Sequence, residues 1–199
     1  MYVSEFMIQL MKFIFVGLFF LFTADLFAQN KVLVVYHSET GNTEQMALAV
    51  AEGAAGVDGI EVVLKNVNTV QVADLLEAGA IIVGSPVYNA NVSPEISAFI
   101  ASWPFEGEPL RDKIGAAFVT AGGISAGEEI VQMNILQSML VFGMIVVGGP
   151  DWTQPFGASA ITGEKPFEME GAGSISNQFL EKGRALGERV AGITKKIHD

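Results

Sequence analysis

From Lys31 onward, short apolar runs alternate with longer segments whose apolar residues recur at helical spacing. The runs predict β-strands at residues 31–36, 61–66, 80–84, 114–120 and 144–148. The intervening segments predict helices at residues 43–53, 70–77, 94–103, 128–142 and 174–197. Residues 32–35 and 81–83 are apolar without interruption, which indicates strands that helices cover on both faces. The pattern therefore predicts an α/β fold, a doubly wound five-stranded parallel sheet with helices on both faces.

The first thirty residues follow a different pattern. Lys12 precedes an apolar run at residues 13–22, and a small residue, Ala28, follows shortly after. A charged start, a short apolar centre and a small residue at the cleavage point are typical of a secretory signal peptide. We therefore expect a signal peptide at residues 1–28, one domain at residues 29–199 and export to the periplasm. The alternative is an uncleaved membrane anchor at residues 11–27, although the apolar run is shorter than the roughly 20 residues of a spanning helix.

Charge and composition exclude several kinds of site. The formal net charge is −11 at pH 7 and no basic cluster occurs, which argues against a nucleic-acid-binding surface. The chain has no cysteine, which excludes disulfides, thiolate nucleophiles and iron–sulfur clusters. The two histidines, His37 and His198, leave little for a histidine-based metal site, and we expect no metal.

The loop after the first predicted strand carries the most informative chemistry. Ser38, Thr40 and Thr43 offer hydroxyl donors around Gly41, immediately before a predicted helix. Hydroxyls, backbone N–H groups and the positive end of a helix dipole together suit a phosphate monoester. No lysine or arginine lies in this loop, so neutral donors would hold the anion. The simpler alternative is a strand–turn–helix unit in which Thr40 or Asn42 caps the helix.

Two further loops, at residues 85–94 and 121–127, follow the third and fourth predicted strands. Parallel strands end at the same edge of a sheet, and ligands bind there, where the strand order reverses. We therefore expect the three loops to converge on one crevice. Each loop taken alone would be read as an ordinary turn.

The motif S-x-T-G-N-T at residues 38–43 resembles the FMN-phosphate loop of flavodoxin-like proteins. The sequence GSPVYN at residues 84–89 resembles a ring-side segment of the quinone-reductase branch of that superfamily. Residues 157–163 and 182–191 are similar to the C-terminal part of the NAD(P)H:quinone oxidoreductases once named for tryptophan-repressor binding. The resemblance spans about residues 31–197, and it implies a flavodoxin-like sheet of order 2-1-3-4-5 with non-covalently bound FMN.

The resemblance assigns the phosphate to the first loop and the flavin ring to the other two. The residues implied for the phosphate are Ser38, Glu39, Thr40, Gly41, Asn42 and Thr43. Those implied for the ring are Pro86, Val87, Tyr88, Asn89, Thr120, Ala121, Gly122 and Gly123. Tyr88 is expected to lie on or beside the ring, and the alternative is a surface tyrosine in a proline-containing turn.

The chain departs from this family at two positions. Where the family carries a histidine over the flavin face, before the fifth strand, this chain has Phe142. The family tryptophan beside the ring has no clear counterpart. Trp103 and Phe105 are candidates, and core packing is the default expectation for Phe105. The loss of the histidine bears on catalysis more than on FMN binding, and no catalytic residue is assigned.

The resemblance implies two-electron reduction of a quinone, with NAD(P)H as the donor and FMN as the cofactor. One alternative is a flavodoxin-type electron carrier with a redox-protein partner, which the acidic charge suits. Another is an exported module that kept the fold without flavin. Residues 149–156 resemble the enzyme branch more than a short carrier loop. The family also implies a homo-oligomer, a dimer or a tetramer.

Overall fold

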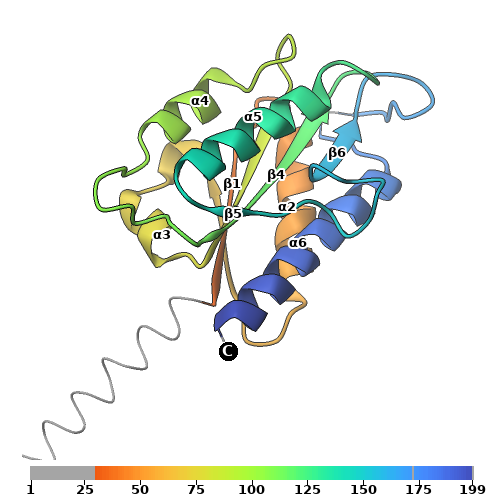
Figure 1. Ribbon diagram of the computed structural model, residues 1–199. Helices are drawn as coiled ribbons and strands as arrows, with labels where there is room; N and C mark the ends of the chain where they lie inside the picture. Colours follow the sequence, from red (N-terminus) through yellow and green to blue (C-terminus); the bar gives the residue numbers. More distant parts are fainter. Residues whose placement is uncertain (1–29, 172, 199) are drawn as a thin grey trace, which may run out of the picture.

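The computed structural model describes residues 30–171 and 173–198, and Figure 1 shows their arrangement. The predicted signal peptide at residues 1–28 and the alternative anchor at residues 11–27 lie outside the described residues. Within the described residues, no helix is both long enough and apolar enough to cross a membrane.

A parallel sheet forms the centre of the molecule, in the order β2-β1-β3-β4-β5, with β6 also paired to β4. Its strands are β1 (Lys31–Tyr36), β2 (Glu61–Asn66), β3 (Ala80–Pro86), β4 (Ile114–Ala121), β5 (Ile145–Val146) and β6 (Ala158–Ile161). β1 pairs in parallel with both neighbours, so that Val32 lies opposite Val62 of β2 and Ala80 of β3. The predicted fold class and strand order are confirmed.

Two short strands share the fifth position of the sheet. β5 pairs with the first half of β4, where Ile145 lies opposite Ile114, and β6 pairs with the second half, where Ala158 lies opposite Phe118. Residues 147–157 leave the sheet between them. The prediction of one strand at residues 144–148 is wrong in this respect. The sequence GGP at residues 148–150 ends β5, because glycine weakens a strand and proline has no N–H to donate.

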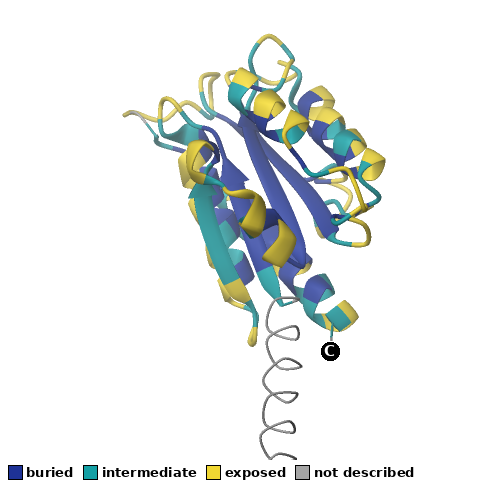
Figure 2. Cartoon of the chain, turned by 90° about the vertical axis from the view of Figure 1, so that its left-hand side faces the viewer, coloured by how far each residue is buried: buried dark blue, intermediate teal, exposed yellow. Residues whose placement is uncertain are grey.

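Helices cover both faces of the sheet (Figure 1). They are α2 (Asn42–Ala55), the 3-10 helix η1 (Val67–Thr69), α3 (Val72–Glu77), α4 (Pro94–Ala101), α5 (Glu128–Val141) and α6 (Asn177–His198). α2 and α6 lie on one face, and α3, α4 and α5 lie on the other. The central strands are buried between the two layers, as Figure 2 shows, and the exposed residues gather on the outer sides of the helices and in the loops.

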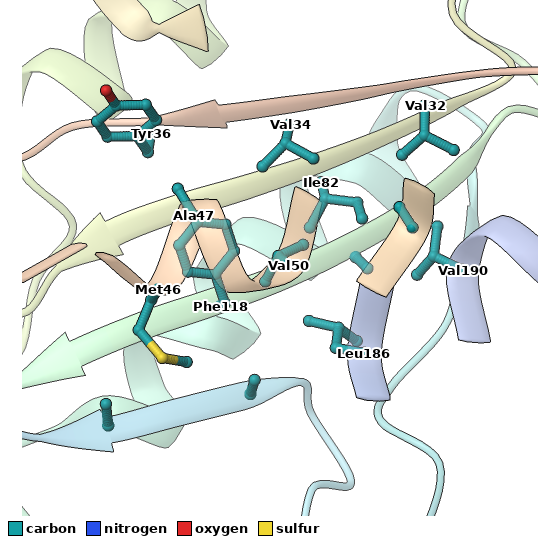
Figure 3. Packing of buried hydrophobic residues seen from close by; sticks show 14 of the residues in the cluster. Val32, Val34, Tyr36, Met46, Ala47, Val50, Ile82, Phe118, Leu186 and Val190 are labelled. Carbon is teal, nitrogen blue, oxygen red and sulfur yellow. The ribbon is translucent and has the colours of Figure 1, made fainter. Parts of the chain in front are cut away.

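The core beneath α2 and α6 is built around Phe118 of β4. Figure 3 shows Met46 and Val50 of α2 near its ring and Leu186 of α6 beyond Val50, and all four side chains are buried in one cluster. Gly84 of β3 leaves space for that ring, since a Cβ at Gly84 would collide with it. This packing fixes the carboxyl ends of β3 and β4, from which two of the predicted loops extend.

Candidate functional site

The loops after β1, β3 and β4 contact one another at the carboxyl edge of the sheet. Oγ1 of Thr43 and Oγ1 of Thr120 lie 2.8 Å apart, and this buried hydrogen bond joins the start of α2 to the end of β4. The N–H of Val87 donates to the carbonyl of Thr120 at 2.8 Å, and the N–H of His37 donates to the carbonyl of Gly84 at 3.2 Å. The structure therefore brings together the three loops that the sequence predicted to converge.

The loop at residues 38–43 leads into a helix that no side chain caps. Gly41 is the N-cap residue of α2, with a φ of 88°, and the described residues provide no side-chain capping hydrogen bond at this end of the helix. The alternative in which Thr40 or Asn42 caps this helix is therefore wrong. Oγ of Ser38 accepts a hydrogen bond from the Gly41 N–H at 3.1 Å, which leaves the Ser38 hydroxyl hydrogen able to donate. Because the first N–H groups of a helix have no partner within it, this end of α2 can bind an anion.

The loop after β3 forms a tight turn around Asn89 and Ala90. Tyr88 and Asn91 exchange two backbone hydrogen bonds of 3.0 and 2.9 Å, and the two residues between them have positive φ values of 52° and 59°. Burial raises the pKa of the Tyr88 phenol, and a hydrogen bond to the Glu39 side chain raises it further. Tyr88 is therefore linked to the first loop and is not a free surface side chain.

The loop after β4 packs against this turn on one side and against β6 on the other. Gly127 has a φ of 105°, and a Cβ there would collide with Ala90 of the turn. The N–H of Gly163 donates to the carbonyl of Gly122 at 3.0 Å. The glycines at these positions allow backbone segments to approach closely.

Two contacts at this edge involve residues that the sequence did not single out. Oε2 of Glu164 accepts a hydrogen bond of 2.6 Å from the Ile124 N–H, which anchors the loop after β4. A Cβ at Gly41 would lie 3.2 Å from the Cα of Gly173, so the segment before α6 touches the first loop. The glycines at 171 and 173 are the signal that could have indicated this approach. Glu164 carried no signal, because exposed acidic residues are numerous in this chain.

The charge at this edge is acidic. No lysine or arginine occurs in residues 37–43, 85–94 or 121–127. The Tyr36 hydroxyl donates to Oε1 of Glu44 at 2.8 Å, and burial together with this hydrogen bond raises the pKa of Tyr36 to about 12. An anion at this site would therefore be held by hydroxyls, amides and the helix dipole, without a cationic side chain from these loops.

Three aromatic residues lie at the opposite edge of the sheet. The Phe142 ring packs on Trp103 at 5.3 Å and on Phe105 at 5.7 Å between centroids. α4 and α5 begin at the carboxyl edge and run back along the sheet, so residues after their last turns reach the amino ends of the strands. Within one chain, Trp103, Phe105 and Phe142 therefore lie at the edge opposite the three loops at which the flavin is expected. Phe105 is 62% exposed, so its expected core packing is wrong.

Comparisons with known proteins agree with this geometry. Residues 30–158 match the family model described as NADPH-dependent FMN reductase. A flavodoxin from Aquifex aeolicus is 37% identical over 172 residues, which cover 81% of this chain and 85% of the relative. An NAD(P)H dehydrogenase (quinone) from Azorhizobium caulinodans is 32% identical over 198 residues, which cover 84% of this chain and 98% of the relative.

Among solved structures, the flavodoxin, WrbA-like protein from Agrobacterium tumefaciens matches with a TM-score of 0.69 and 25% identity. The match covers 83% of this chain and 98% of that one. The sequence match, the parallel sheet and the loops at its carboxyl edge lead to one assignment. The chain belongs to the NADPH-dependent FMN reductase family, within the flavodoxin-like superfamily.

Proposed function

We propose that this chain binds FMN at the three converging loops and reduces a quinone with electrons from NAD(P)H. Family membership makes the chain an FMN-binding oxidoreductase. The quinone acceptor is proposed because a relative from Azorhizobium caulinodans carries that name. Bound FMN supplies the hydride and electron transfer, whereas the protein supplies binding, orientation and electrostatics.

The uncapped N-terminus of α2 is the observation that carries the FMN site. Two other helices that start at the same edge are capped: Asp74 accepts from the Gln71 N–H at 2.7 Å in α3, and Ser93 accepts from the Ile96 N–H at 3.3 Å in α4. α2, like α5 behind Gly127, begins behind a glycine with no side-chain cap, and among these helices it is the one that follows the hydroxyl-bearing loop at residues 38–43. Its first amides are therefore available to a ligand, and a phosphate is the ligand that suits them.

Each loop residue has a definite part in this proposal. The hydroxyls of Ser38 and Thr40 donate to the phosphate, along with the backbone amides of residues 39, 40, 42 and 43, since the Gly41 amide donates to Ser38. Glu39 contributes only its amide, because its carboxylate is negative and bonds to Tyr88. The Thr43 hydroxyl donates to the phosphate while it accepts from Thr120, so that Thr120 positions it. The residues proposed to frame the ring are Pro86, Val87, Tyr88, Asn89, Thr120, Ala121, Gly122 and Gly123.

Titration of the purified chain with FMN tests the site. Thr40 is exposed in the loop, so Thr40→Val removes one donor without disturbing the core. A hydrogen bond to a charged group contributes about 1.5–3 kcal/mol, so the affinity for FMN should fall roughly tenfold or more. Ser97→Ala, on the exposed side of α4, is the control and should bind FMN as the wild type does. Unchanged affinity in Thr40→Val would contradict the phosphate site.

The second candidate is an electron carrier, which the net charge of −11 and the Aquifex aeolicus flavodoxin favour. Anaerobic NADPH oxidation with a soluble benzoquinone as acceptor distinguishes a quinone reductase from an electron carrier. An enzyme turns over many equivalents of NADPH. A carrier is reduced by dithionite or a partner protein and shows no such turnover, and that result would overturn the quinone reductase assignment.

We also propose export, on the sequence of residues 1–28, to the periplasm, with the membrane-anchored form as the alternative. The intact mass of the protein recovered from cells that express the full chain distinguishes them. Loss of residues 1–28 supports export with cleavage. Retention of those residues in the membrane fraction supports the anchor.

The proposal includes a homo-oligomer, a dimer or a tetramer. Ile130, Leu140 and Val141 of α5 are 64%, 54% and 70% exposed, so this helix presents apolar side chains to water. Ile130 also lines a surface groove of about 400 Å³ with Met133 and Phe156. A second copy seated on this face of α5 would remove these side chains from water.

A further inference from the structure

The carboxyl edge of the sheet also gathers a histidine and two glutamates. His37 directly follows β1, Glu39 lies in the loop at residues 38–43, and Glu95 is in the first turn of α4. One ligand atom from each of these side chains lies within 4.8 Å of those of the other two. Glu39 comes from the first loop and Glu95 from the helix that follows the second, so the fold and not the local sequence brings them together.

The buried imidazole of His37 points to a ligand. His37 is 6% exposed, and its Nδ1 has no hydrogen-bond partner among the described residues. Oε2 of Glu95 lies 3.3 Å from Nδ1, yet the two atoms form no hydrogen bond, and Oε2 is likewise buried without a partner. Native proteins rarely leave buried polar atoms unpaired, and a bound ion can satisfy such atoms where no protein group does.

We infer that His37, Glu39 and Glu95 bind a divalent transition-metal ion. One imidazole nitrogen with two carboxylate oxygens is a ligand set of the zinc type, with further positions left for water. Ligand atoms about 2.1 Å from one ion lie at most about 4.2 Å apart, so small rotations of the glutamates complete the site. The Tyr88 phenol, whose pKa burial and the Glu39 carboxylate both raise, interacts with that carboxylate, and such neighbours commonly orient metal ligands.

The ion would also change the electrostatics of the neighbouring loop. Glu39 places a negative charge beside the proposed phosphate site, and no lysine or arginine lies in that loop to offset it. A bound dication removes this repulsion, so the ion and FMN should each raise the affinity of the site for the other. This coupling rests on the proposed FMN site, whereas the metal site itself does not.

Calorimetric titration of the full, tag-free, FMN-free chain with ZnCl₂, after removal of metals with EDTA, tests the inference. We expect one zinc ion per chain. His37→Gln and Glu95→Gln should each lower the affinity at least tenfold, because each removes a ligand. His198→Gln removes the other histidine and should leave zinc binding unchanged. Absence of zinc binding, or equal binding by His37→Gln and the wild type, would overturn the metal site.

Two further measurements separate loss of zinc binding from misfolding, and the metal site from the proposed FMN site. If His37→Gln fails to fold, as judged by circular dichroism, Glu39→Gln replaces it, because Glu39 is exposed and its loss should weaken zinc binding without unfolding the chain. FMN titration with and without zinc then tests the coupling. Severalfold tighter FMN binding with zinc is expected, and equal affinity would overturn the coupling. Failure to bind FMN at all, with zinc binding intact, would contradict the proposed function and leave the metal site standing.

Discussion

At the scale of single residues, the hydroxyl pair of Thr43 and Thr120 links the start of α2 to the end of β4. Both residues were candidates for FMN contact on the sequence, and the structure shows that their side chains also bond to each other. Because both are buried, removal of one hydroxyl leaves the other without its partner. The pair therefore allows a test of how the two loops are coupled.

Thr43→Val and Thr120→Val should each lower the free energy of unfolding by about 1–3 kcal/mol, since each leaves a buried hydroxyl unpaired. The double variant removes both hydroxyls with little change of shape, so its loss should be clearly smaller than the sum. Urea unfolding of the wild type, the two single variants and the double variant measures these changes in the free energy of unfolding. Additive losses would show that the hydrogen bond contributes no coupling.

Tyr36 gives the stability a dependence on alkaline pH. Its pKa in the fold is about 12, above the usual 10.0, so the folded state holds the phenolic proton more tightly than the unfolded chain does. This contribution is fully present below pH 10 and is lost as pH rises toward 12. One pKa unit corresponds to about 1.4 kcal/mol, so the loss is at most about 3 kcal/mol.

Unfolding of the wild type and Tyr36→Phe between pH 8 and 12 measures this dependence. The wild type should lose stability relative to the variant across the upper part of that range, since phenylalanine has no proton to lose. If the free energies of unfolding of the two proteins change with pH in parallel, the pKa of Tyr36 is the same in the folded and the unfolded chain. Glu44 is exposed, so loss of its partner leaves no buried charge.

Among elements, α2 and α6 pack closely because glycines stand at their contact. A Cβ at Gly187 of α6 would collide with the carbonyl oxygen of Val50 in α2, and one at Gly53 would collide with the carbonyl oxygen of Arg184. Gly187 lies in residues 182–191, which the sequence singled out only by a family resemblance, and close packing against α2 explains why a glycine stands there.

Gly187→Ala should therefore destabilise the protein by several kcal/mol, because the collision is with backbone and no side chain can move aside. Gly192→Ala in the same helix is the control. A Cβ at Gly192 meets nothing within 4 Å, so the substitution should raise stability by up to about 1 kcal/mol through helix propensity. Thermal unfolding of both variants measures the difference, and similar melting temperatures would contradict close packing at Gly187.

Element types were predictable from the sequence wherever the apolar pattern was strong. β1 and β2 fall at the predicted residues 31–36 and 61–66, and each predicted helix is present with modest changes at its ends. The exception is β6 at Ala158–Ile161, whose small residues lack the β-branched run of the other strands. Its pairing with β4 makes it a strand, and that partner is distant in the sequence.

For the whole molecule, the exposed apolar face of α5 leads to a prediction about assembly. Light scattering after gel filtration should give a dimer or tetramer for the wild type. Leu140→Glu with Val141→Glu places charges on this face and should yield monomers. Val72→Glu on α3, where Val72 is 51% exposed, is the control and should keep the wild-type assembly. A monomeric wild type would contradict the proposed oligomer.

Local periodicity and neighbouring residue types were enough to predict the alternation of strands and helices, the five positions of the sheet and the loop chemistry that suits a phosphate. Which distant groups meet became clear only from the three-dimensional fold. The fold places Phe142 and Trp103 at the far edge of the sheet and brings Glu95 to His37, which had no predicted metal-binding partner. Side-chain contacts across a sheet depend on strand order and helix direction, and local patterns do not contain these.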